Sequence, residues 1–127
     1  MEACNSTGHS KSGVESAMQK YDHYILNLDA DSISLLFTPD GSLGDMATGR
    51  DSIKRFLSSF KNVKVLSQSS TTKNIETIKD TAIQTGTYTQ SDVVSGKDTV
   101  DVKGEFTARW QWMNNDWYIK KMITRSL

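Results

Sequence analysis

The chain changes character at Phe60, and this change constrains the fold more than any other feature of the sequence. Before Phe60, apolar residues recur every three or four positions, which is the spacing of amphipathic helices. After it, threonine and valine predominate and apolar residues alternate with polar ones, as is typical of strands. Helices followed by strands predict an α+β domain in which the helices pack on one face of the sheet.

Three helices are expected before Phe60. The first runs from Val14 for about four turns, because its core-facing stripe comprises Val14, Ala17, Met18, Tyr21, Tyr24, Ile25 and Leu28. A short second helix follows Asp29, whose carboxylate suits an N-cap, and ends at a turn over residues 39–41. The third begins near Asp51 and carries Ile53, Phe56, Leu57 and Phe60.

Four long antiparallel strands are expected at residues 61–72, 74–90, 98–113 and 116–126, with a break in the second at 79–80. Long antiparallel sheets twist and curl. Helices laid across the concave side leave its deep end unfilled. The sequence therefore predicts a cone that encloses a pocket.

Composition excludes several classes of protein. The chain has 127 residues, 15 basic and 15 acidic, so its formal net charge is zero and there is no basic face for nucleic acid. No apolar stretch is long enough to span a bilayer. One cysteine and two histidines supply neither a disulfide nor a structural zinc site, and we expect no metal and no cofactor. Zero net charge also favours a neutral ligand over a charged one.

Residues 1–13 are rich in serine, glycine and asparagine, so we expect a disordered tail followed by one domain at 14–127. Ala3 and Cys4 before a Ser/Gly-rich spacer resemble the start of a mature bacterial lipoprotein. Two interpretations stay open: a plain tail on a cytoplasmic protein, or a secreted or periplasmic lipoprotein anchored through Cys4.

The strand expected at 98–113 has one aromatic face and one polar face. Its apolar face carries Phe106, Ala108, Trp110 and Trp112, and its other face carries Glu105, Thr107, Arg109, Gln111 and Met113. The aromatic row either packs as core or forms a pocket wall. For the pocket interpretation, the residues expected around a flat apolar or aromatic ligand are Tyr24, Phe56, Tyr88, Ala108, Trp110 and Trp112.

The order of these elements resembles the nuclear transport factor 2-like superfamily, in particular its SnoaL-like and ketosteroid isomerase-like small proteins. The segments that carry the resemblance are YDHYILNLDADSISLLF, TPDGSLGD, TGRDSIKRFL, DTAIQTGTYT and GEFTARWQWMNNDWYIKKM. It implies a cone-shaped, cystatin-like fold with a pocket. Because function is diverse on this fold, the resemblance does not decide the activity.

The resemblance also implies roles for single residues. Tyr21 matches the oxyanion-hole tyrosine of the steroid isomerases and Asp45 matches their catalytic base, whereas their second acid falls at Ala108. A methyl group donates no hydrogen bond, which disfavours steroid isomerisation and leaves another proton transfer, hydration or cyclisation. The alternatives are that Asp45 is a surface carboxylate and that Tyr21 is a core residue.

Two functions therefore stand side by side. The first is a small-molecule-binding protein with an apolar aromatic pocket and weak general acid/base activity of the isomerase, cyclase or hydratase type. The alternative is a non-enzymatic module that forms a homodimer or docks a partner through the outer sheet face, on which Glu105 and Arg109 lie.

Overall fold

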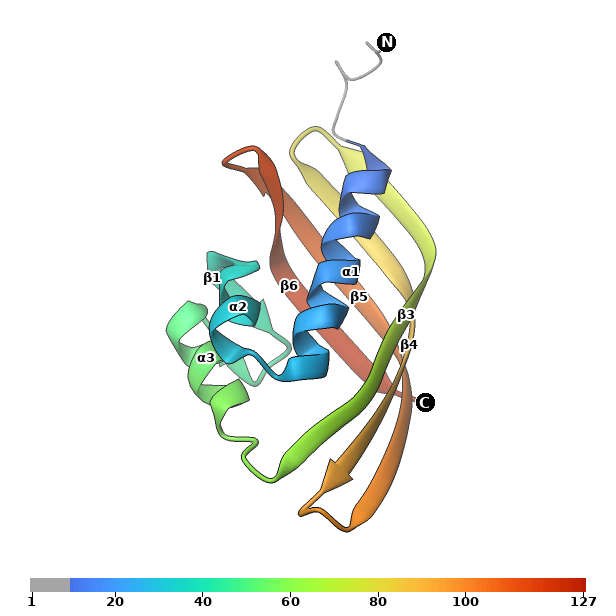
Figure 1. Ribbon diagram of the computed structural model, residues 1–127. Coiled ribbons are helices and arrows are strands. Elements are labelled where there is room, and N and C mark those ends of the chain that lie inside the picture. The colour runs from blue at the N-terminus through green and yellow to red at the C-terminus, as the bar shows by residue number, and fades with distance from the viewer. Residues whose placement is uncertain (1–9) are drawn as a thin grey trace.

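The computed structural model describes residues 10–127, which form three helices and one six-stranded mixed sheet. The elements are α1 (Lys11–Asn27), α2 (Ala30–Leu35), β1 (Phe37–Leu43), β2 (Ala47–Thr48), α3 (Arg50–Ser58), β3 (Val63–Ile78), β4 (Thr81–Val94), β5 (Asp98–Met113) and β6 (Asp116–Ser126). The strand order is β2-β1-β6-β5-β4-β3, in which only β1 and β6 pair in parallel. Figure 1 shows α1 crossing the face of the long strands, with α2 and α3 beside β1. The α+β class is confirmed, and the sheet is open rather than closed.

Helix α1 begins within the segment that was expected to be a tail. Ser10 caps it by accepting a hydrogen bond from the Gly13 N–H at 3.0 Å. A side chain at Gly13 would meet the Trp117 ring at 3.3 Å, so glycine allows the first turn to pack closely against β6. The first helix therefore begins three residues before residue 14, and residues 1–9, which include Cys4, lie outside the described residues.

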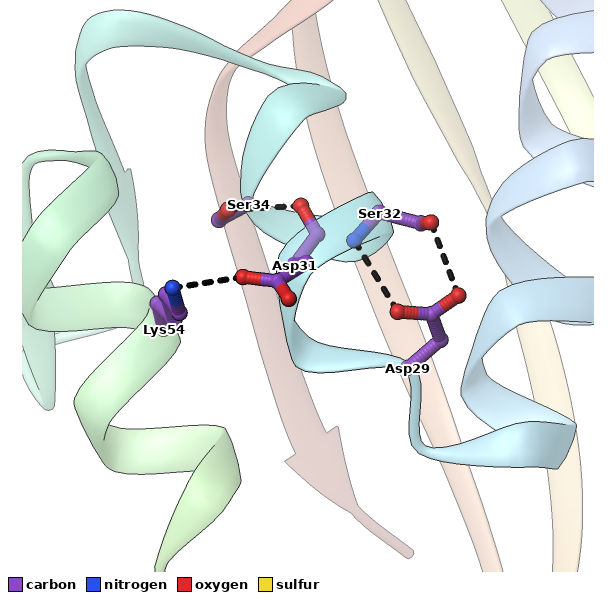
Figure 2. Close-up of polar contacts among 5 residues, drawn as sticks. All are labelled: Asp29, Asp31, Ser32, Ser34 and Lys54. Atoms are coloured by element: carbon purple, nitrogen blue, oxygen red, sulfur yellow. Dashed lines mark hydrogen bonds and ion pairs between the residues drawn. The ribbon is translucent and has the colours of Figure 1, made fainter.

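Polar contacts fix the short helix α2 and join it to α3 (Figure 2). Asp29 caps α2 by accepting hydrogen bonds from the Ser32 N–H at 3.2 Å and the Ser32 hydroxyl at 2.8 Å, and these bonds lower the pKa of its carboxyl group. Asp31 pairs with Lys54 of α3 at 2.6 Å. Both partners are exposed, so this pair orients the two helices more than it stabilises them.

Strand β1 replaces the turn that was expected at residues 39–41. It runs through Pro39 and Gly41, and its pairing with β6 is irregular between Phe37 and Ser42. A side chain at Gly41 would lie 2.8 Å from the Ile119 carbonyl oxygen, so only glycine fits there. Proline and glycine at these positions mark an irregularity within a strand rather than its end.

The hairpin between β3 and β4 corrects a second expectation. Strands β5 and β6 have the predicted bounds, and the break expected at residues 79–80 is the turn between β3 and β4. The strand end expected near residue 73 is instead only a bulge between Thr72 and Asn74. The sequence here is a run of Ser, Thr, Lys and Asn, which has no apolar alternation to place a strand end.

Two glycine–aromatic pairs shape the middle of the sheet. Gly86 pairs with Phe106 and Gly104 pairs with Tyr88 across β4 and β5. A side chain at Gly86 would meet the Phe106 ring at 2.8 Å, and one at Gly104 would meet the Tyr88 ring at 2.5 Å. Each ring therefore lies over a glycine on the face that α1 covers, and the two strands can curve around the helix.

Candidate functional site

Two hollows flank α1, and the expected ligand residues divide between them. The first, here called the inner cleft, has a volume of about 380 Å³ between α1, α3 and the sheet. Its apolar wall includes Tyr21, Phe56, Phe60, Tyr88 and Phe106, and its polar members include Gln68, Gln90, Asp92 and Thr124. The cleft thus brings together three of the residues singled out from sequence: Tyr21, Phe56 and Tyr88.

The second hollow, here called the outer groove, has a volume of about 760 Å³ between α1, α2 and the β5–β6 hairpin. Tyr24 and Trp112 line this groove rather than the inner cleft, together with Lys20, Leu35, Trp117 and Tyr118. The single aromatic pocket that was expected is therefore two separate hollows.

The other two expected ligand residues, Ala108 and Trp110, line neither hollow. They are 0% and 1% exposed and belong to the packed core. The Trp110 Nε1–H donates to the Gln84 Oε1 at 3.1 Å, and the Gln84 amide nitrogen donates to Thr72 at 2.8 Å and to Glu15 at 3.3 Å. Every part of the buried Gln84 amide has a partner, so this end of the aromatic row packs the structure.

Tyr21 brings a phenol to the inner cleft. Its side chain is 7% exposed, and its ring packs edge-on against Phe37 with the ring centres 6.4 Å apart. Among the described residues, its hydroxyl group has no hydrogen-bond partner. Burial raises the pKa of Tyr21 well above its ordinary value of 10, and the nearby Asp22 carboxylate raises it further. The hydroxyl therefore keeps its proton and is available as a donor.

A polar cluster that sequence reasoning missed lies beside Tyr21. Asp22 on α1 accepts hydrogen bonds from the Gln68 Nε2 at 3.1 Å and the Ser70 hydroxyl at 2.5 Å, which ties α1 to β3. The other end of the same amide, the Gln68 Oε1, is buried and has no partner among the described residues. Nothing in the sequence marks Gln68, because its position depends on the pairing of distant strands.

A second missed pair follows on β4. The Gln90 amide nitrogen donates to both oxygens of the Asp92 carboxylate, at 2.9 and 2.8 Å. Gln90 lies directly opposite Gln68 in the sheet, so the two amides and Asp92 form one polar strip in the cleft wall.

Asp45, the expected base, lies elsewhere. It is exposed in the turn between β1 and β2 and is not among the residues that line the inner cleft, although its neighbour Met46 is. The catalytic pairing of Asp45 with Tyr21 stays a prediction, and the geometry does not bring the two side chains together.

Within residues 10–127, no three His, Cys, Asp or Glu side chains gather in a way that could hold a metal ion. Over the same residues, no helix is long and apolar enough to cross a membrane.

Comparison with known proteins finds similar structures but no similar sequence families. No protein-family model and no curated protein sequence matches the chain. Solved structures do: a ketosteroid isomerase-like protein from Erwinia carotovora atroseptica matches with a TM-score of 0.80 and 17% identity, over 91% of this chain and 95% of that one. The chain therefore shares the fold of this ketosteroid isomerase-like protein.

Two further structures with this fold illustrate how its uses vary. A protein from Catenulispora acidiphila, solved in complex with S-DNPA, has a TM-score of 0.78 and 14% identity over 91% of each chain. A putative calcium/calmodulin-dependent protein kinase II association domain from Xanthomonas campestris has a TM-score of 0.76 and 15% identity, over 100% of this chain and 98% of that one. At these identities the likeness establishes the fold alone.

Proposed function

We propose that the protein binds a small, mainly apolar molecule in the inner cleft. The observation that carries this proposal is Tyr21, a largely buried side chain whose hydroxyl has no partner among the described residues, in the wall of a mainly apolar hollow of about 380 Å³. Small-molecule sites are mostly apolar with a few placed polar groups, and this volume lies in their usual range. The Catenulispora protein with this fold, solved with a bound small molecule, supports the same interpretation.

General acid/base activity is the finer part of the proposal. Tyr21 keeps its proton, so it can stabilise an oxygen that gains negative charge. Ala108 is fully buried and offers no second donor, which disfavours the steroid isomerase reaction. Asp45 is outside the cleft wall, and we therefore propose ligand binding as the principal function and weak proton transfer as secondary.

The neutral fluorescent probe N-phenylnaphthylamine tests the proposal. Thr124 is an exposed residue of β6 that lines the cleft, so Thr124→Trp should fill its mouth without removing a core side chain. Ile123 is the adjacent residue, 44% exposed and outside the cleft wall, and Ile123→Trp is the matched control. We expect Thr124→Trp to weaken probe binding at least about tenfold and Ile123→Trp to leave it unchanged. Equal affinity in both variants would overturn the proposal.

The outer sheet face supports a second candidate, formation of a homodimer. Ile83 and Ile123 are 40% and 44% exposed there, amid Thr107 and Arg109. A mixed face of this kind suits a polar interface between two copies. Light scattering at high micromolar concentration tests it: a dimer that Ile123→Lys dissociates is expected, and a monomeric wild-type protein would contradict it.

A further inference from the structure

The polar strip of the inner cleft contains a buried hydrogen-bond acceptor that has no partner among the described residues. The Asp22 and Asp92 carboxylates only accept, so the amide nitrogens of Gln68 and Gln90 must turn toward them. The amide oxygens then point away from these carboxylates, and the Gln68 Oε1 is buried and accepts no hydrogen bond among the described residues. The unsatisfied group of the strip is therefore an acceptor, the Gln68 Oε1.

The cleft wall also carries a negative charge. Among the described residues that line the cleft, Asp92 is the only charged one, and the remaining wall is apolar or neutral. Its carboxylate is paired with an amide rather than a cation, so its negative charge is not neutralised within the strip. A buried or half-buried carboxylate in an apolar wall attracts a positive partner more strongly than one in water does.

The aromatic rings of the wall favour the same kind of partner. Tyr21, Phe56, Phe60, Tyr88 and Phe106 all line the cleft. The faces of aromatic rings carry negative charge and attract ammonium groups, especially where water is excluded. The rings and the carboxylate together form a surface that complements a hydrophobic molecule with a positively charged group.

We infer that the ligand of the inner cleft is a ring-containing amine, whose ammonium group binds Asp92 and the Gln68 Oε1 while its apolar skeleton fills the space between α1, α3 and the sheet. This rests on the proposed function and replaces the neutral ligand favoured by the net charge of the chain. A ligand whose polar end only accepts hydrogen bonds would leave the Gln68 Oε1 without a donor and the charge of Asp92 without a cation, which costs binding free energy.

Three probes with one skeleton and different end groups test the inference by calorimetry at neutral pH: naphthylethylamine, naphthylethanol and naphthylacetate. We expect the amine to bind at least about tenfold more tightly than the alcohol, because hydrogen bonds to charged groups are the stronger ones, and the carboxylate to bind most weakly.

Substitutions test which residues cause the preference for the amine over the alcohol. Asp92→Asn keeps the shape of the side chain and an acceptor for Gln90, and we expect it to remove the preference for the amine while changing the affinity for the alcohol by less than about twofold. Gln68→Leu should weaken binding of the amine as well. Asp98→Asn is the charge-matched control on an exposed residue outside the cleft wall, and it should leave all three affinities unchanged.

The outcomes separate this inference from the proposed function. If the alcohol binds and Thr124→Trp blocks it, but the amine binds no more tightly, the inference is wrong and the proposed function stands. A preference for the amine that survives Asp92→Asn also overturns the inference. If none of the three probes binds, both are overturned.

Discussion

Two glutamines tie α1 to the sheet in the same way, yet only one of them is fully bonded. In the Gln84 cluster, Glu15 of α1, Thr72 of β3 and Trp110 of β5 use every part of the amide. In the Gln68 cluster, Asp22 of α1 and Ser70 of β3 are arranged alike, but the Gln68 Oε1 has no partner among the described residues. Glu15 and Asp22 are seven residues apart, about two turns, so one helix face presents both carboxylates to the sheet.

The difference in bonding between Gln84 and Gln68 indicates different roles for the two clusters on α1. A buried polar group without a partner costs free energy, and proteins retain such groups where something else is gained. Gln84 and Trp110 lie in the packed core, whereas Gln68 lines the inner cleft. We therefore assign the first to holding the fold and the second to meeting a ligand.

The largest expected effect is a loss of stability on removing Trp110 from the core. Trp110 is 1% exposed, and Trp110→Ala should lower the free energy of unfolding by about 3–5 kcal/mol through the lost burial and the cavity left behind. Urea unfolding measures this loss. Trp112→Ala is the comparison, because Trp112 is only partly buried and lines the outer groove. A loss from Trp112→Ala as large as that from Trp110→Ala would contradict the division between core and groove.

The matched pair Gln84→Leu and Gln68→Leu tests the comparison directly. Gln84→Leu leaves the buried Trp110 N–H without its acceptor and should cost about 1–3 kcal/mol of stability. Gln68→Leu removes an acceptor that has no partner and leaves Asp22 bonded to Ser70, so its effect on stability should be below about 1 kcal/mol.

Ligand affinity should respond in the opposite order. Gln68→Leu should weaken binding of naphthylethylamine, and Gln84→Leu should not, when both are measured on folded protein at low temperature. If Gln68→Leu destabilises the protein as much as Gln84→Leu does, the two clusters have the same structural role and the comparison fails.

Alkaline pH probes Tyr21, the neighbour of the Gln68 cluster. Its pKa is raised in the folded protein, so the stability it contributes is present below pH 10 and is lost as the pH rises above the ordinary tyrosine value. The free energy of unfolding of the wild-type protein should then fall by up to about 1.4 kcal/mol per pH unit more steeply than that of Tyr21→Phe. Urea unfolding between pH 9 and pH 11 measures both slopes, with Tyr24→Phe as the control. Parallel slopes for wild type and Tyr21→Phe would show that Tyr21 ionises as freely in the folded state as in the unfolded one.

Much of the fold could be predicted because its signals are local. The stripe of α1 and the alternation of β5 and β6 each lie within one element. The bounds of β5 and β6 were predicted, and α1 begins three residues before its predicted start. The break predicted at residues 79–80 is the β3–β4 turn. The continuation of β3 through residue 73 and the existence of strand β1 were not predicted, because a run of hydroxyl side chains marks no strand end and because Pro39 and Gly41 are usual turn residues.

The site was less predictable because it depends on contacts between distant segments. Tyr21 lies on the core stripe of α1 and could be singled out from sequence. Gln68 and Asp92 are polar residues in polar strands, and their importance arises only when β3 and β4 pair and place them beside α1. The aromatic row was recognised, but sequence alone could not show that Trp110 lies in the core and Trp112 in the outer groove.

Asp45→Asn is the variant with the smallest expected effect. It tests whether Asp45 acts at the site, as the resemblance to the steroid isomerases implies, or lies outside it, as its position in the structure indicates. Asp45 is exposed and outside the cleft wall, so the substitution should leave stability and the affinities for all three naphthyl probes unchanged. Asp92→Asn, the same chemical change inside the cleft, is its positive control. A loss of affinity of about tenfold or more in Asp45→Asn would show that the β1–β2 turn moves over the bound ligand, and the pairing of Asp45 with Tyr21 would then regain its catalytic interpretation.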